Sequence, residues 1–153
     1  MTRSIVEQAH DFYDAVPYEV PVPEASLYEL LDTAARLYPD RVALDYFGST
    51  TTYAQVRDQV LRAARVLHEA GVRAGDTVAI ALPNCPQAFV AFYACMRIGA
   101  VAAQHNPLAP AQEIAGQLAR HGGRVAIVWE KCVDAYPLDA LDTVLTVDIS
   151  FAM

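Results

Sequence analysis

Positive charge is scarce in this chain. Its 153 residues carry 11 Lys and Arg against 18 Asp and Glu, a formal net charge of −7, and Lys131 is the one lysine. A protein that binds a nucleic-acid backbone needs a basic face, because the phosphates are negatively charged. The sequence has no cluster of basic residues to supply that face, so we exclude nucleic acid as a partner.

Paired cysteines and long apolar runs are also missing. The three cysteines, Cys85, Cys95 and Cys132, have no CxxC spacing, which predicts free thiols in a reducing compartment. The apolar run 88–96 is far shorter than the ~18 residues of a membrane span. Acidic residues interrupt the first 20 positions, where a secretory signal needs an apolar stretch. We predict a cytoplasmic protein with no transmembrane segment.

Glycine is sparse and gives no phosphate-binding loop. None of the 7 glycines forms a GxGxxG motif between a strand and a helix. Helix ends and turns account for Gly71, Gly75, Gly99, Gly122 and Gly123. What the chain does have is apolar material, 54% of its residues against 19% charged ones. This composition predicts a folded core, and the length fits one domain.

Helical and strand-like segments alternate along the sequence. Helices are predicted from Ser26 to Pro39, over 53–70, from Pro86 to Gly99 and from Pro110 to Gly122. Continuous apolar strands are predicted at 77–82, 100–103, 124–129 and 143–149, and a β-hairpin at 42–47 and 50–52 with its turn at Gly48-Ser49. This alternation favours right-handed crossovers. We predict an α/β fold, a three-layer sandwich with a mainly parallel sheet, with residues 1–25 as an N-terminal arm and 26–153 as the α/β domain.

The same spacing predicts which side chains point inward. Residues 88–96 are apolar all round, which is typical of a helix buried in the core. His68 and His121 lie near helix ends and are expected to be exposed there, where a cation suits the helix dipole. In the first helix the inward face is expected to consist of Leu27, Leu30, Leu31 and Ala34.

His105 and Asn106 are the candidate substrate-binding residues, because they follow a buried strand and ligands of parallel sheets sit beyond the strands' carboxyl ends. The alternative is a turn in which both side chains bond to nearby backbone, and this interpretation is favoured. A thiol nucleophile at Cys85 with His105 as its base is a weaker alternative. His10, His68 and His121 show no metal-ligand spacing, so no metal ligand is assigned. No catalytic residue is assigned either.

Three segments carry a resemblance to a known family. They are TTTYAQV (50–56), GVRAGDTVAIALPNCPQAFVAFYACMRIGAVAAQHNPLAP (71–110) and EIAGQLARHGGRVAIVWEK (113–131). In this order they resemble the N-terminal part of the adenylate-forming superfamily, which contains acyl-CoA synthetases, adenylation domains and luciferases. The details AFYA, HNPL and RVAIVW are similar to bacterial long-chain fatty-acid CoA ligases of the actinobacterial type.

The resemblance implies an activity for a whole enzyme and not for this chain alone. Such an enzyme uses ATP, Mg²⁺ and coenzyme A to activate a fatty acid. The sequence has no Ser/Thr/Gly-rich loop ending in Lys-Gly, so we expect a truncated, inactive N-terminal fragment that needs no cofactor itself. Two alternatives stay open. One is an autonomous, non-catalytic α/β module that binds a small ligand, and the other is self-association as a homodimer through a surface exposed by truncation.

Overall fold

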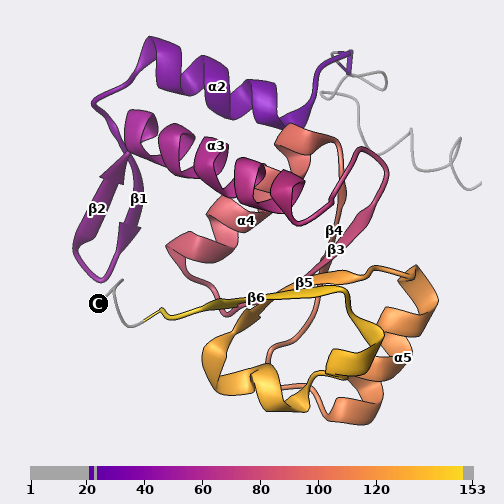
Figure 1. The fold of residues 1–153 in the computed structure, drawn as a ribbon. Coiled ribbons are helices and arrows are strands. Elements are labelled where there is room, and N and C mark those ends of the chain that lie inside the picture. Colours follow the sequence, from indigo (N-terminus) through magenta and orange to yellow (C-terminus); the bar gives the residue numbers. More distant parts are fainter. Residues whose placement is uncertain (1–20, 23, 150–153) are drawn as a thin grey trace, which may run out of the picture.

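The computed structural model describes residues 21–22 and 24–149 (Figure 1), and almost all of the predicted N-terminal arm lies outside them. In chain order, the elements are α2 (Leu27–Leu37), β1 (Val42–Tyr46), β2 (Ser49–Thr52), α3 (Tyr53–Glu69), β3 (Thr77–Ala81), α4 (Pro86–Ile98), β4 (Val101–Gln104), α5 (Ala111–His121), β5 (Val125–Trp129), the 3₁₀ helices η1 (Glu130–Ala135) and η2 (Leu138–Ala140), and β6 (Thr143–Val147).

The predicted β-hairpin is present, with its turn one residue earlier than expected. β1 and β2 pair antiparallel, and the turn residues are Phe47, with φ 51°, and Gly48, with φ 85°. Positive φ at both central residues suits the right-handed twist of a hairpin. The Asp45 carboxylate accepts a hydrogen bond from the Gly48 amide at 3.0 Å, which holds the turn closed. Ser49 therefore belongs to β2.

The main sheet has four parallel strands in the order β4-β3-β5-β6. Helices α2, α3 and α4 lie on one side of it, and α5 with the 3₁₀ helices lies on the other (Figure 1). The prediction of a three-layer α/β sandwich with a mainly parallel sheet is confirmed. β3 and β5 occupy the centre and are buried along almost their whole length, whereas β6 is a half-buried edge strand that ends at Val147. The expectation of a buried strand over 143–149 was wrong because β6 has a neighbour on one side.

The inward face of α2 differs from the prediction. Leu31 and Ala35 are buried, but Leu27 and Leu30 keep 49% and 57% of their surface exposed. Leu31 packs with Val56 of α3, so this part of the core fixes the rotation of the helix. The spacing alone predicts an apolar stripe but not which edge of it meets the neighbouring helices.

Helix α4 is less buried than its all-apolar sequence predicts. Ala91, Ala94 and Cys95 are buried, whereas the aromatic side chains are half-buried. Pro86 stands in the first turn, where its missing amide proton costs no hydrogen bond, and Gly99 ends the helix with φ 81°. The half-buried aromatic residues lie beside a cavity.

Candidate functional site

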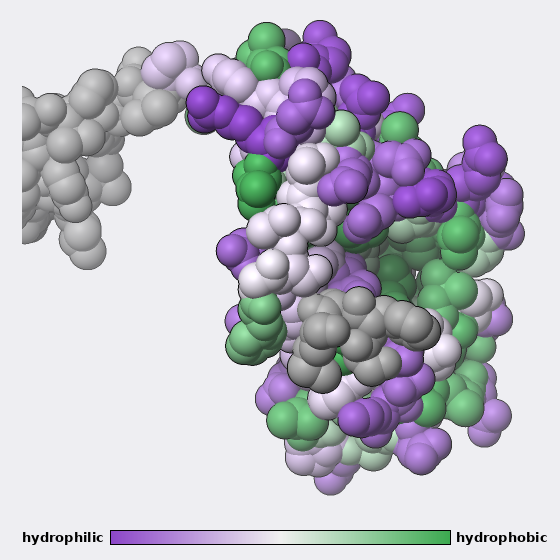
Figure 2. All heavy atoms as spheres, turned by 90° about the vertical axis from the view of Figure 1, so that its left-hand side faces the viewer, coloured by the Kyte–Doolittle hydropathy of each residue, from purple (hydrophilic) through white to green (hydrophobic). Residues whose placement is uncertain are grey.

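A cavity of about 530 Å³ lies between α4, the β-hairpin and the carboxyl ends of β3 and β4. Figure 2 shows hydrophobic residues around a hollow on this side of the molecule. Ligands of parallel sheets bind beyond the carboxyl ends of the strands, and ligand cavities measure about 300–1,000 Å³. Both its position and its size therefore make this cavity, called the aromatic cavity below, the candidate functional site.

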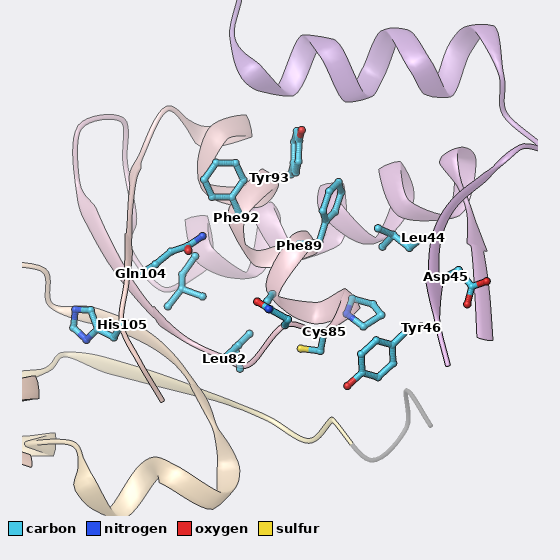
Figure 3. A pocket seen from close by; sticks show the side chains of 14 residues that line it. Leu44, Asp45, Tyr46, Leu82, Cys85, Phe89, Phe92, Tyr93, Gln104 and His105 are labelled. Carbon is cyan, nitrogen blue, oxygen red and sulfur yellow. The ribbon is translucent and has the colours of Figure 1, made fainter. Parts of the chain in front are cut away.

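Aromatic side chains of α4 form one wall of the aromatic cavity (Figure 3). The ring centroids of Phe89 and Tyr93 are 4.6 Å apart, and those of Phe92 and Tyr93 are 5.5 Å apart, which are favourable separations for ring pairs. Leu44 and Tyr46 of the hairpin lie across from them (Figure 3). The polar lining residues are Asp45, Asn84, Gln104 and His105. The arrangement suits an apolar group with a polar end.

Cys85 lines the aromatic cavity at the start of α4, but it does not form a nucleophile–base pair with His105. Both ring nitrogens of His105 lie within hydrogen-bond distance of other side chains, Tyr136 at 3.2 Å and His121 at 2.9 Å. A general base needs a free nitrogen that reaches the thiol. The structure therefore does not favour the thiol nucleophile. Cys95 is more deeply enclosed, and burial raises the pKa of its thiol to about 11.

The two candidate residues His105 and Asn106 have different environments. Asn106 is exposed, and its side-chain oxygen accepts a hydrogen bond from the Leu108 amide at 3.0 Å, as expected for a turn. His105 is buried, with 7% of its surface exposed, and bonds to side chains of distant elements rather than to nearby backbone. The turn interpretation thus describes Asn106 and fails for His105.

His121 is a partner of His105 and not the exposed helix-end residue that we expected. It is half-buried at the end of α5, and its Nε2 lies 2.9 Å from the Nε2 of His105. Sequence reasoning missed both His121 and Tyr136, which are 16 and 31 residues away from His105. The three side chains meet only in the folded chain, where the end of α5 and the residue after η1 lie beside the end of β4. His68, in contrast, is exposed as predicted.

Within residues 21–22 and 24–149, no three side chains of the His, Cys, Asp and Glu types lie close enough together to hold a metal ion. In the same part of the chain, no helix is long and apolar enough to cross a membrane. The aromatic cavity thus offers an apolar wall together with the Asp45 carboxylate, the amide groups of Asn84 and Gln104 and the imidazole of His105.

A parallel sheet with helices on both faces, preceded by a small hairpin, defines an α/β N-terminal subdomain of the adenylate-forming type. The family model described as "AMP-binding enzyme" matches residues 31–151, and the chain belongs to this family. The resemblance deduced from the three sequence segments is confirmed.

Among its relatives, a long-chain-fatty-acid–CoA ligase of Bacillus subtilis is 32% identical over 71% of this chain and 19% of the ligase. An acetyl-coenzyme A synthetase of Emericella nidulans is 44% identical over 52% of this chain and 13% of that enzyme. Among solved structures, the N-terminal subdomain of Klebsiella oxytoca NpsA in complex with anthranilyl-AMSN has a TM-score of 0.71 and 31% identity, covering 78% of this chain and 30% of that one. This chain thus spans less than a fifth of the two curated relatives.

Proposed function

We propose that this chain is the N-terminal portion of a long-chain fatty-acid CoA ligase. The observation that carries the proposal is the family match over residues 31–151, joined to the alignment with the B. subtilis ligase over 71% of the chain. The E. nidulans synthetase aligns over a smaller part. A fatty acid and coenzyme A are the proposed substrates, and the cytoplasm is the proposed location.

The proposed reaction has two steps. A carboxylate oxygen of the fatty acid attacks the α-phosphorus of ATP, and the P–O bond to pyrophosphate breaks. Bound Mg²⁺ would balance the charge of the leaving group. The sulfur of coenzyme A then attacks the acyl carbonyl carbon and loses its proton, and AMP leaves. The protein positions the reactants and stabilises the developing charge. The 153 residues contain no Ser/Thr/Gly-rich loop ending in Lys-Gly, so we propose that they do not catalyse either step alone.

A chimeric enzyme tests the proposed family role. Residues 31–151 would replace the matching segment of the B. subtilis ligase, and hydroxylamine would trap acyl-adenylate formed from palmitate, ATP and Mg²⁺. We expect the chimera to form hydroxamate at a rate within roughly tenfold of that ligase, a change of about 1.4 kcal/mol in the barrier. The 153-residue chain alone should form none above a heat-denatured control.

A chimera that melts cooperatively but forms no hydroxamate would count against the family role. Robust hydroxamate formation by the chain alone would instead contradict its inactivity. Because the two outcomes concern different samples, each part of the proposal can fail separately. Self-association as a homodimer stays a prediction that no feature described above tests.

A second candidate function, favoured by the aromatic cavity, is the non-catalytic binding of a small acyl ligand. Calorimetric titration with palmitoyl-CoA is expected to give saturable binding if the cavity accepts the acyl chain. Ala88 lines the cavity, so Ala88→Trp should fill it and weaken the binding at least tenfold. Ala54→Trp, on α3 and outside the cavity lining, is the control. Absent heat, or equal affinity in all three proteins, would remove this candidate.

A further inference from the structure

Three side chains from separate elements meet behind the aromatic cavity. His105 follows β4, His121 ends α5, and Tyr136 follows η1. The Nε2 atoms of His105 and His121 are 2.9 Å apart, and the Nδ1 of His105 is 3.2 Å from the Tyr136 hydroxyl. His105 and Tyr136 are buried, with 7% and 4% of their surface exposed. We call this group the His–Tyr junction.

A backbone amide determines where the protons of the His–Tyr junction lie. The Gly123 N–H donates to the Nδ1 of His121 at 3.0 Å, so that nitrogen must carry a lone pair. Neutral His121 therefore holds its proton on Nε2 and donates it to the Nε2 of His105. His105 in turn must hold its own proton on Nδ1, which donates to the Tyr136 hydroxyl. The donor and the acceptor of each hydrogen bond in the junction thus follow from the bond between Gly123 and His121.

This arrangement requires that both imidazoles are neutral. A second proton on His121 would place an N–H against the Gly123 N–H, and one on the Nε2 of His105 would place it against the N–H of His121. It also disfavours a bound metal ion, because the Nε2 of His121 is a donor and offers no lone pair.

Asp45 of β1, whose carboxylate accepts a hydrogen bond from the Gly48 amide, is the one acidic residue among the described residues that line the aromatic cavity together with His105 of the His–Tyr junction. A smaller cavity of about 290 Å³ beside the junction is lined by Gln117 and Arg120 of α5, and no carboxylate is among the described residues that line it. Glu113, one turn away, accepts a hydrogen bond from Gln117 at 3.0 Å. On η1 the titratable neighbour is Cys132, which lies close enough to affect Tyr136. Burial, and then the charge that His121 carries when protonated, lower the pKa of His105. Burial and the charge of Arg120 lower the pKa of His121, against a backbone hydrogen bond that raises it.

We propose that the His–Tyr junction is a pH-sensitive latch that joins β4, α5 and η1 while both imidazoles are neutral and releases them when either takes up a proton. His105 and its neighbour Gln104 also line the aromatic cavity, so the latch fixes one wall of that cavity. The function of the latch is to make the shape of this wall depend on pH below neutrality.

The sign of the pH dependence follows from the lowered pKa values. An unfolded histidine takes up its proton near the ordinary pKa of 6.5, whereas His105 and His121 do so at lower pH in the folded protein. Between those values the unfolded chain binds more protons, so acid favours unfolding. The stability contributed by the latch is complete above about pH 6.5 and falls as the pH is lowered below it.

Nitrogen-15 NMR of the imidazole rings tests the latch directly. At pH 8 we expect His121 in the Nε2–H form and His105 in the Nδ1–H form, with exposed His68 as a reference in the same spectra. As the pH is lowered, both junction histidines should become imidazolium only below the ordinary histidine pKa of 6.5, and the Gly123 amide resonance should shift with them. The opposite tautomers at pH 8, or shifts on adding Zn²⁺ that indicate ligation by both rings, would overturn the proposal.

Thermal unfolding between pH 8 and pH 5 gives a second, independent measurement. His121→Gln removes one titrating group, so its melting temperature should fall less with pH than that of the wild type. His68→Gln is the matched control, since His68 lies outside the junction, and it should retain the wild-type slope. Equal slopes in all three proteins would contradict the latch. If His121→Gln does not fold, Tyr136→Phe replaces it. His105 should then keep its Nδ1–H tautomer, because Gly123 and His121 set it, while its Nδ1 resonance shifts because the acceptor is gone; a change to the Nε2–H tautomer would contradict the latch.

Discussion

Replacing Leu67 by alanine is expected to lower the free energy of unfolding by about 2–5 kcal/mol. Leu67 lies on α3 with 1% of its surface exposed, inside the part of the core that contains Val72, Val78 and Ile80. The substitution removes buried methyl groups and leaves a cavity that the packed neighbours fill only in part. Urea unfolding followed by circular dichroism measures the change.

Leu61 provides a control for this substitution on the same helix. It is also a leucine of α3, but 40% of its surface is exposed. Leu61→Ala keeps the helix propensity comparable and should change the free energy of unfolding by no more than about 0.5 kcal/mol. Equal losses in the two variants would mean that α3 does not pack on the sheet through the Leu67 face.

Replacing Gly123 by alanine is expected to lower the free energy of unfolding by about 1–3 kcal/mol. A Cβ atom at this position would lie 2.7 Å from the Thr77 carbonyl oxygen and 3.0 Å from two atoms of the His121 ring. The carbonyl belongs to the first residue of β3, so it cannot move without shifting the central strand. Thermal melts measure the loss, and nitrogen-15 NMR reports the accompanying change at His121.

Gly116→Ala is the matched control. Gly116 lies within α5, is exposed, and would have no heavy atom within 4 Å of an added Cβ. Alanine is the better helix former, so this variant should be more stable by about 0.5–1 kcal/mol. The two identical substitutions are thus expected to act in opposite directions. If Gly123→Ala were as stable as the wild type, the close approach of β3 and the start of β5 would be wrong.

The helices and strands of this fold could be predicted because residues close to each boundary determine where the element begins or ends. Pro86 and Gly99 set the ends of α4, and Thr52 closes a capping box with Gln55 at the start of α3. Continuous apolar runs predicted the central strands. The predictions were wrong where the burial of a residue depends on contacts with elements far away in the sequence. Leu27 and Leu30 are exposed because α2 packs on α3 through Leu31. β6 is half-buried because it is an edge strand.

The candidate site could be predicted only in part, because its residues are also brought together by contacts between elements that are distant in the sequence. His105 was singled out from its place after a strand, but its partners come from α5 and η1. No spacing rule joins residues that meet only after two crossovers of a parallel sheet. The aromatic cavity could not be predicted either, because the sequence of an all-apolar helix does not indicate which of its faces lies beside a cavity and which packs on other elements. The half-buried Phe92 and Tyr93 identify that side only in the folded chain.

The strand order also dictates how the sheet can be completed while the chain is being synthesised. β3 pairs with β4 on one side, but its other side must wait for β5, which is made later. A nascent chain that ends before residue 125 therefore leaves one edge of β3 with unpaired backbone groups beside the apolar side chains of Val78 and Ile80. Such an open edge is prone to pair with other chains. During synthesis, a strand that is buried in the finished protein thus has an open edge until β5 is made.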